Sequence, residues 1–279
     1  MILYHYCSTY AFFNILKDRT LFLSSLTSSN DTREGRWLSE VLRDVLIRKK
    51  AKRSVVSELV RQLSTVEETS IAYGFCLSQR RDMLSQWRGY ADDASGFAIG
   101  FDKEALQRAV SGLNLPTLVD PRLLPVAYKE SDQAALIEAD VDQILERLEG
   151  HTLFRPTILG NQDMDKALEV YKAKLEMVQE SINKWWRFIF ATKNPAFEDE
   201  HEWRLIQEDA LSHLGVDFRV RGSELVPYVK LDFPKDVWEG MVKEIWIGPK
   251  NRTSREVVRD FARTLELSAR VVISSASYR

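Results

Sequence analysis

The sequence has little cysteine, little excess charge and no long apolar run, and each absence argues against a class of protein. Cys7 and Cys76 are the only cysteines among 279 residues, which disfavours a disulfide framework and fits a reducing cytoplasm. With 39 basic and 41 acidic residues the formal net charge is −2, which does not favour nucleic acid as a partner. No stretch approaches the roughly 20 apolar residues of a membrane span, and no signal peptide is evident. We therefore expect a cytoplasmic protein without a membrane partner.

Motifs of several enzyme classes are also missing. The four histidines are His5, His151, His201 and His213, and none forms an HxH, HExxH or HxxxH ligand pair. We therefore predict no catalytic metal site. The sequence contains no GxGxxG, Walker or GxSxG motif, which disfavours a Rossmann fold, a P-loop fold and a serine hydrolase.

The hydrophobic content, 44% of the residues, is enough for a sizeable core. Short apolar and aromatic runs predict strands that alternate with amphipathic segments of helical periodicity. Strands are expected at 2–6, 20–24, 70–77, 96–102, 123–129, 217–220, 225–233, 242–247 and 270–274, and helices at 10–17, 31–50, 54–63, 78–93 and 253–265. This pattern predicts an α+β fold with a mixed, largely antiparallel sheet and flanking helices. We expect a single domain, 1–279, with a helical insertion at about 131–192.

An acidic run late in the chain, EDEHEWRLI, is the first candidate site. If it forms a strand, Glu200 and Glu202 point to the same face, Arg204 follows them and His201 takes the other face. Two neighbouring carboxylates repel each other, and such pairs are found at functional sites. The alternative is that Glu202 and Arg204 form an ordinary ion pair at a solvated edge.

Aromatic residues and one histidine provide the other candidates. His5 stands between Tyr4 and Tyr6 in the first strand, where it could bind a ribose hydroxyl, act as a base or be a purely structural histidine. Trp87 and Tyr90 recur at helical spacing. Such residues belong to a core or present a ring for stacking on a planar ligand.

Several segments resemble the bacterial and phage-borne family named domain of unknown function 2971. They are LYHYCSTYAFFNILKDRTLFLSSLTSSNDTREG, FCLSQRRDMLSQWRGYADDASGFAIGFD, EDEHEWRLI, EIWIGPK and ISSASYR, in that order. The resemblance extends over nearly the whole chain, and W-x-x-Y-A…G-F-x-I-G-F and E-x-E-W-R are its most specific motifs. The chain departs from the family at residues 30–34, where NDTRE replaces Asn-Asp-Pro-Phe-Glu.

The layout is also similar, more distantly, to ADP-ribosyltransferases, with an early Tyr-His-aromatic strand and a late E-x-E strand. This resemblance implies NAD as cofactor and Glu202 as the carboxylate that stabilises the positively charged ribose transition state. It implies that Glu200 orients or deprotonates the acceptor. His5 would hold NAD, and Tyr90 would stack on nicotinamide, with Tyr73 or Tyr6 as the alternatives. The candidate set is therefore Glu202 and Glu200 as catalytic residues and His5, Tyr6, Tyr90 and Trp87 as cofactor-binding residues.

Three functions remain open from the sequence. The first is an ADP-ribosyltransferase-like enzyme that modifies a macromolecule or nucleotide, as a toxin or phage-defence effector, and it requires His5, Tyr90 and Glu202 in one cleft. The second is a non-catalytic recognition or regulatory module of a bacterial defence system, in which Trp87 and Tyr90 are buried and the other groups scattered. The third is a metal-dependent nuclease, which requires gathered carboxylates such as Asp199.

Overall fold

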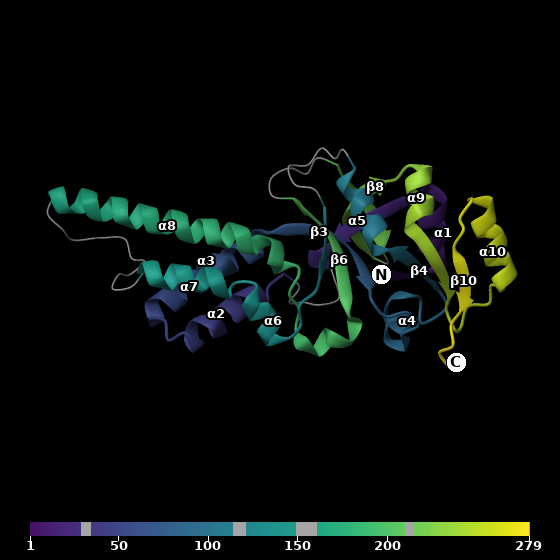
Figure 1. Cartoon of the computed structure of the whole chain (residues 1–279), viewed down its shortest axis with the longest axis horizontal. Helices are drawn as coiled ribbons and strands as arrows, with labels where there is room; N and C mark the ends of the chain where they lie inside the picture. Colours follow the sequence, from purple (N-terminus) through teal and green to yellow (C-terminus); the bar gives the residue numbers. More distant parts are fainter. Residues whose placement is uncertain (29–34, 114–120, 149–160, 210–214, 222, 279) are drawn as a thin grey trace. The chain divides into compact units, whose positions relative to one another are not determined.

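The computed structural model describes residues 1–28, 35–113, 121–148, 161–209, 215–221 and 223–278 (Figure 1). By its internal contacts the chain forms two compact units, each assembled from separate stretches of sequence. Unit 1 comprises Met1–Ser28, Ile71–Val126 and Glu198–Arg279, and unit 2 comprises Ser29–Ser70 and Ala127–Phe197. The candidate residues all belong to unit 1.

Unit 1 contains the strands and the helices that cover them. Its strands are β1 (Ile2–Cys7), β2 (Thr20–Ser25), β3 (Ile71–Ser78), β4 (Phe97–Asp102), β5 (Arg122–Pro125), β6 (Glu202–Asp209), β7 (Val216–Arg221), β8 (Glu224–Asp232), β9 (Val242–Ile247) and β10 (Arg270–Ile273). Its helices are α1 (Thr9–Asp18), η1 (Leu26–Ser28), α4 (Leu84–Tyr90), α5 (Lys103–Ser111), α9 (Lys235–Met241) and α10 (Arg255–Thr264). The sequence did not predict α5 or α9.

The strands form one mixed sheet in the order β10-β9-β4-β1-β3-β2-β8-β7, with β6 pairing to β3 and β5 pairing to β6. Only β9 and β10 are parallel among the described strand pairs, and the others are antiparallel. The predicted α+β class and the largely antiparallel sheet are therefore confirmed. The hairpin of β7 and β8 is confirmed as well.

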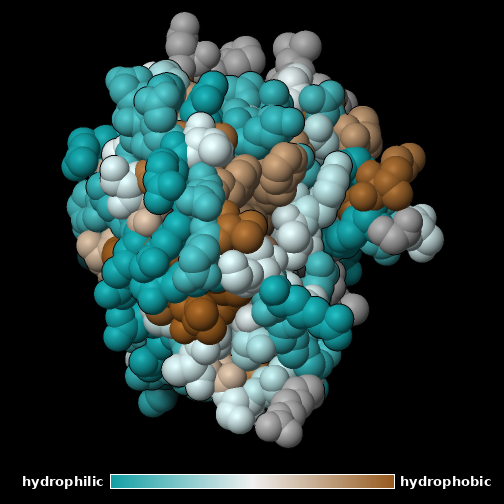
Figure 2. All heavy atoms as spheres, turned by 90° about the vertical axis from the view of Figure 1, so that its right-hand side faces the viewer, coloured by the Kyte–Doolittle hydropathy of each residue, from teal (hydrophilic) through white to brown (hydrophobic). Residues whose placement is uncertain are grey.

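The two faces of the sheet are packed by different sets of side chains. Alternation along β1 sends Leu3 and Cys7 into the larger apolar core, with α1, α5, α9 and α10. The same alternation sends Tyr4 and Tyr6 to the opposite face, where they pack with Trp87 of α4. We call these the core face and the α4 face. Figure 2, which views unit 1 from the side of α10, shows apolar patches interrupting a mostly hydrophilic surface.

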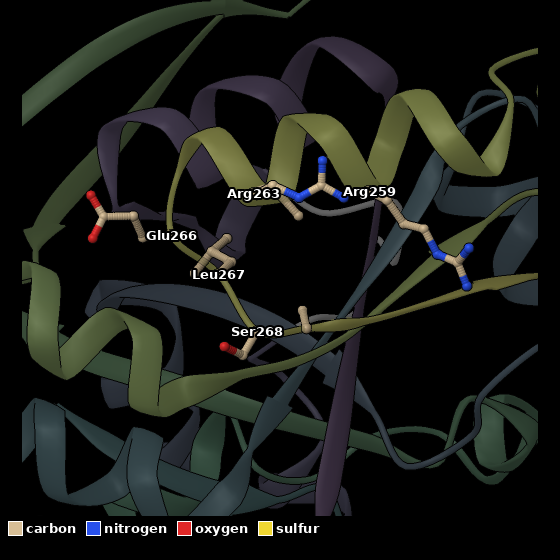
Figure 3. A pocket seen from close by; sticks show the side chains of 7 residues that line it. Arg259, Arg263, Glu266, Leu267 and Ser268 are labelled. Carbon is tan, nitrogen blue, oxygen red and sulfur yellow. The ribbon is translucent and has the colours of Figure 1, made fainter.

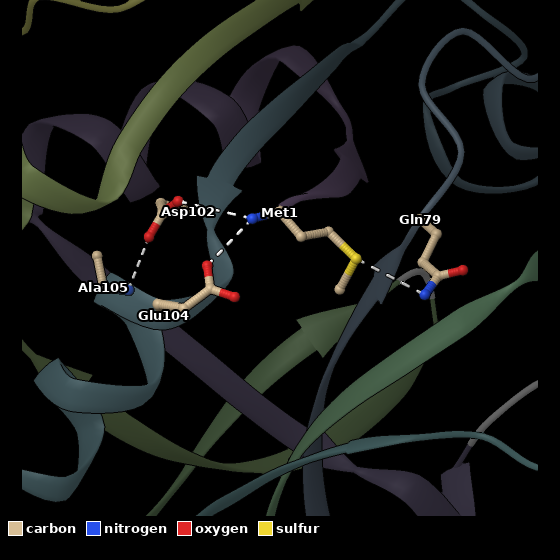
Figure 4. A network of polar contacts seen from close by, with 5 residues as sticks. All are labelled: Met1, Gln79, Asp102, Glu104 and Ala105. Carbon is tan, nitrogen blue, oxygen red and sulfur yellow. Dashed lines mark hydrogen bonds and ion pairs between the residues drawn. The ribbon is translucent and has the colours of Figure 1, made fainter.

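Side-chain caps fix where several helices begin. Ser8 accepts a hydrogen bond from the backbone N–H of Ala11 at 3.1 Å and starts α1, as the sequence predicted. Helix α10 is capped by Ser254, one residue after the predicted Thr253. Asp102 caps α5 through the N–H of Ala105, and it lies near the Met1 ammonium group, which also contacts Glu104 at 3.1 Å (Figure 4).

Unit 2 is helical. It contains α2 (Leu38–Arg48), α3 (Arg53–Thr69), α6 (Glu130–Ala135), α7 (Glu138–Leu148) and α8 (Asn161–Ile189), and η2 (Pro195–Glu200) runs from unit 2 into unit 1. The helices expected at 31–50 and 54–63 correspond to α2 and α3. Sequence periodicity did not indicate that they would group with the predicted helical block at 131–192. Gln133 is fully buried and binds Trp37, the carbonyl of Ala127 and the carbonyl of Lys193.

None of the helices in the described part of the chain combines the length and the apolar character that crossing a membrane requires.

Candidate functional site

The acidic segment does not continue as one strand. Glu200 is the last residue of η2, His201 has a φ of 44°, and β6 begins only at Glu202. The prediction that Glu200 belongs to the strand is therefore wrong, because the left-handed backbone at His201 interrupts the alternation. The side-chain hydroxyl of Ser78 donates to the Glu200 carbonyl at 2.7 Å, and the N–H of Gln79 donates to the His201 carbonyl at 3.0 Å. These bonds hold the turn against β3.

Glu202 is locked into a buried ion pair. The Arg204 guanidinium donates from Nε to Oε1 at 2.9 Å and from Nη2 to Oε2 at 2.8 Å. Only 8% of Glu202 and 1% of Arg204 is exposed. The expected partners are correct, but the pair lies inside the protein and not at a solvated edge. Both charges have been taken out of water, and the two hydrogen bonds between them compensate part of that cost.

Tyr90 and Glu200 form a second polar pair, at the surface. The Tyr90 hydroxyl donates to Glu200 Oε1 at 2.9 Å, and 43% of Tyr90 is exposed. Partial burial of the phenol and the negative charges of Glu200 and Glu202 raise the pKa of Tyr90 above its ordinary range. The phenol therefore stays protonated, and its hydroxyl lies in negatively charged surroundings.

Tyr6 and Trp87 support Tyr90 from inside. Trp87 is fully buried, and its ring packs edge-on against that of Tyr6 at a centroid distance of 4.8 Å. The Tyr6 hydroxyl donates to the Arg80 carbonyl at 2.8 Å and accepts from the Met83 N–H at 3.1 Å. Burial raises the pKa of Tyr6. Because neither ring has an open face, the prediction that Trp87 or Tyr6 contacts a cofactor conflicts with their packing.

Asp82 fixes the start of α4. It accepts from the Trp87 indole at 2.9 Å, from the Ser275 N–H at 2.8 Å and from the Ser274 hydroxyl. Its partial burial acts to raise the pKa of Asp82, but these hydrogen bonds outweigh burial and lower it. Asp82 therefore stays ionised and ties residues 274–275 to the helix that carries Tyr90.

Backbone strain is concentrated around this helix. Five of the eight described non-glycine residues with positive φ flank it or the acidic turn, namely Asp82, Asp92, Asp93, Ala94 and His201. Aspartate tolerates this conformation, whereas Ala94 and His201 adopt it at a cost of about 1–2 kcal/mol each. Strain of this kind is commonly retained at functional sites.

His5 lies on the other face of the sheet. It pairs with Ile99 of β4, stacks on Phe75 at a ring distance of 4.0 Å, and its Nδ1 contacts the Cys76 carbonyl at 2.8 Å. Glu202 pairs with Ser78, which in turn pairs with Tyr4 and therefore belongs to the α4 face. The prediction that His5 and Glu202 face one groove is wrong, because adjacent residues of β1 point to opposite faces.

The structure thus unites five of the six candidates. Tyr90, Glu200 and Glu202 lie near one another, Tyr6 and Trp87 pack together on the same face of the sheet, and His5 lies on the other face. We call Tyr90, Glu200 and the adjoining Cys76 the Tyr90 surface. Cys76 is exposed, shares the α4 face with Arg204 and adds to the rise in the Tyr90 pKa. Sequence reasoning did not select Cys76 or Asp82 for the site, although both lie in one segment of the family resemblance, FCLSQRRDMLSQWRGYADDASGFAIGFD.

Unit 1 also has a groove that lies apart from the candidate residues. A shallow groove at the end of α10 is lined by Arg259, Ala262, Arg263, Glu266, Leu267, Ser268 and Ala269 (Figure 3) and includes no candidate residue. Within the described residues, no group of three or more His, Cys, Asp or Glu side chains is placed to hold a metal ion. Residues 30–34, where the sequence departs from the family, lie outside the described residues.

The fold and the site define an α+β protein with a small polar surface on the α4 face of its sheet. Residues 86–205 match the family model described as "Protein of unknown function (DUF2971)". The matched range includes Trp87, Tyr90, Glu200, Glu202 and Arg204, which supports the resemblance to that family. Searches of curated proteins and of solved structures returned no match. The more distant resemblance to ADP-ribosyltransferases is therefore not supported.

Proposed function

We propose that unit 1 is a recognition module whose Tyr90 surface binds a positively charged segment of a partner protein. The observation that carries the proposal is the pair formed by Tyr90 and Glu200. It presents an aromatic ring and a carboxylate at the surface, and a buried framework holds the ring in place.

The charge around Tyr90 selects the class of partner. The negative groups Glu200 and Glu202 raise the Tyr90 pKa, and Asp199 next to them is exposed. A phosphate group would be repelled here, whereas a lysine or arginine would be attracted. An exposed tyrosine ring adds a cation–π contact to the attraction by the carboxylates. A basic peptide is therefore the ligand that this surface fits best.

The buried ion pair favours recognition over catalysis. A catalytic carboxylate must face the reacting atoms, but both Glu202 oxygens accept hydrogen bonds from Arg204. The groups that remain at the surface are suited to bind a cation and to hold it in position.

Binding can be tested by fluorescence anisotropy with a labelled arginine- and lysine-rich peptide and a matched acidic peptide. We expect the basic peptide alone to bind, with an affinity that falls as salt is added. Glu200→Gln is expected to weaken binding by about tenfold, the loss typical of one charge-assisted contact. Tyr10→Phe is the matched control, because Tyr10 is 80% exposed on α1. Equal binding by wild type and Glu200→Gln would rule the proposal out.

One observation favours ADP-ribosyl transfer as a second candidate. Tyr90, Glu200 and Glu202 are close together, as an E-x-E mechanism requires, even though His5 is not with them. The test is incubation of the protein with labelled NAD and a cell lysate. Labelling that disappears in Glu200→Gln and persists in Tyr10→Phe would support the transferase. The absence of labelling by the wild-type protein would eliminate it.

A further inference from the structure

Arg219 is a half-buried cation that has no counter-charge among the residues that the structure describes. It lies on β7, and its Nη2 donates to the Ser24 hydroxyl of β2 at 2.7 Å. Its Nε is buried and has no hydrogen-bond partner. None of the carboxylates in the described ranges forms an ion pair with it. A guanidinium has five N–H donors, so most of the binding capacity of Arg219 is not used by Ser24.

The neighbours of Arg219 do not neutralise it. Burial, and then the positive charge of Arg221 on the same strand face, lower its pKa. Asp217, two residues earlier, is exposed. Removing a cation from water without compensation costs free energy, and such a residue is retained where an anion compensates it.

Arg219 lies on a strand at one end of the sheet, and part of the residue is exposed to solvent. β7 is the last strand on its side of the sheet among the described strands. Strand β6 occupies one edge of β3, so β1 and β2 share the other edge. On that edge β1 pairs at Ser78, and β2 pairs at Tyr73 and Gly74. Between these two contacts β3 pairs with neither strand, and His5 reaches the Cys76 carbonyl there.

From this arrangement we propose that Arg219, assisted by the Ser24 hydroxyl, binds a phosphate-class anion. The planar guanidinium matches two oxygens of such a group, and the hydroxyl offers a third contact. The site is distinct from the Tyr90 surface, which is negatively charged. It therefore does not depend on the proposed recognition function.

His5 provides a spectroscopic reporter of this site. Burial, and to a smaller extent the charge of Arg219, lower the pKa of His5 to about 4. An anion bound to Arg219 offsets that charge, so it should raise the His5 pKa. Binding away from Arg219 would leave the His5 pKa unchanged. Histidine resonances followed by NMR over pH, with and without phosphate, distinguish these outcomes.

Calorimetric titration with inorganic phosphate at low ionic strength gives the direct test, and a parallel titration with AMP asks whether a phosphate ester is preferred. We expect Arg219→Gln to weaken phosphate binding by about tenfold or more and Arg219→Lys to retain part of it. Arg263→Gln removes the same charge from the distant end of α10 and is expected to leave phosphate binding unchanged. The proposal is overturned if Arg219→Gln binds phosphate as the wild type does, or if the wild type binds none at tens of millimolar.

Discussion

Glu200 and Glu202 are two residues apart and both carry a carboxylate, but Glu202 is buried and Glu200 lies at the surface. Glu202 is 8% exposed and bound at both oxygens by Arg204, inside unit 1. Glu200 lies at the surface and accepts a hydrogen bond from Tyr90. The first therefore contributes to folding, whereas the second takes part in a pair at the surface with Tyr90.

The difference arises from the backbone at His201. Its φ of 44° separates the end of η2 from the start of β6, so the two carboxylates leave the chain in different directions. A motif such as E-x-E thus does not define two equivalent acids. The local backbone and the nearest cation decide which one remains at the surface.

The largest effect is expected from breaking the buried pair. Arg204→Met removes the guanidinium and both of its hydrogen bonds from the buried Glu202 carboxylate, which should cost about 3–5 kcal/mol of unfolding free energy in urea denaturation. The double variant Glu202→Leu/Arg204→Met removes both charges and should recover most of that loss. If Arg204→Met cost less than about 1 kcal/mol, the pair would behave as a solvated one.

The next largest effect is expected in the pH dependence of stability, through His5 on the core face. Burial holds the folded-state pKa of His5 at about 4, below the ordinary value of 6.5. The unfolded chain binds the proton more tightly, so stability is complete above about pH 6.5 and falls as the pH is lowered towards 4. The loss should approach ~1.4 kcal/mol per pH unit. The His5→Gln variant should lack this loss of unfolding free energy between pH 6.5 and 4. Identical pH profiles of unfolding free energy in wild type and variant would contradict the prediction.

A smaller effect should test the turn between the two acids. At His201 the positive φ favours glycine over alanine, so His201→Gly should be more stable than His201→Ala by about 1 kcal/mol. Both variants lose the same contact with Arg80, which makes them a matched pair. Equal melting temperatures would mean that the backbone there is not strained.

The smallest effect on stability is expected at the surface pair. Tyr90→Phe removes one hydrogen bond at a half-exposed site, so its cost in unfolding free energy should stay below ~1 kcal/mol. Binding of the basic peptide should nevertheless fall, because the ring is no longer anchored to Glu200. A large loss of stability with unchanged binding would assign Tyr90 to the framework instead.

Much of the fold could be predicted from local patterns. The run 242–247 forms β9, and the spacing of Trp87 and Tyr90 gives α4, because periodicity reflects the burial of one side of an element. The hairpin of β7 and β8 followed from turn residues between two alternating runs.

The site was less accessible to sequence reasoning, for physical reasons. Side-chain alternation tells which residues share a face within one strand. It does not relate the face of His5 in β1 to that of Glu202 in β6. That His5 and Glu202 lie on opposite faces of the sheet follows from the pairing of Ser78 with both Tyr4 and Glu202. No local sequence pattern specifies this pairing. The left-handed backbone at His201 is not predictable from residue type, since only a few per cent of non-glycine residues adopt positive φ, even though histidine does so more often than most. Arg219 looked like any arginine on an exposed hairpin.

The most direct measurement compares the unfolding free energies of Glu202→Gln and Glu200→Gln under identical conditions. We predict that Glu202→Gln loses several kcal/mol, because Arg204 keeps its buried charge, whereas Glu200→Gln stays within about 1 kcal/mol of the wild type. Equal losses in the two variants, or a larger loss in Glu200→Gln, would contradict the division between a structural and a surface carboxylate.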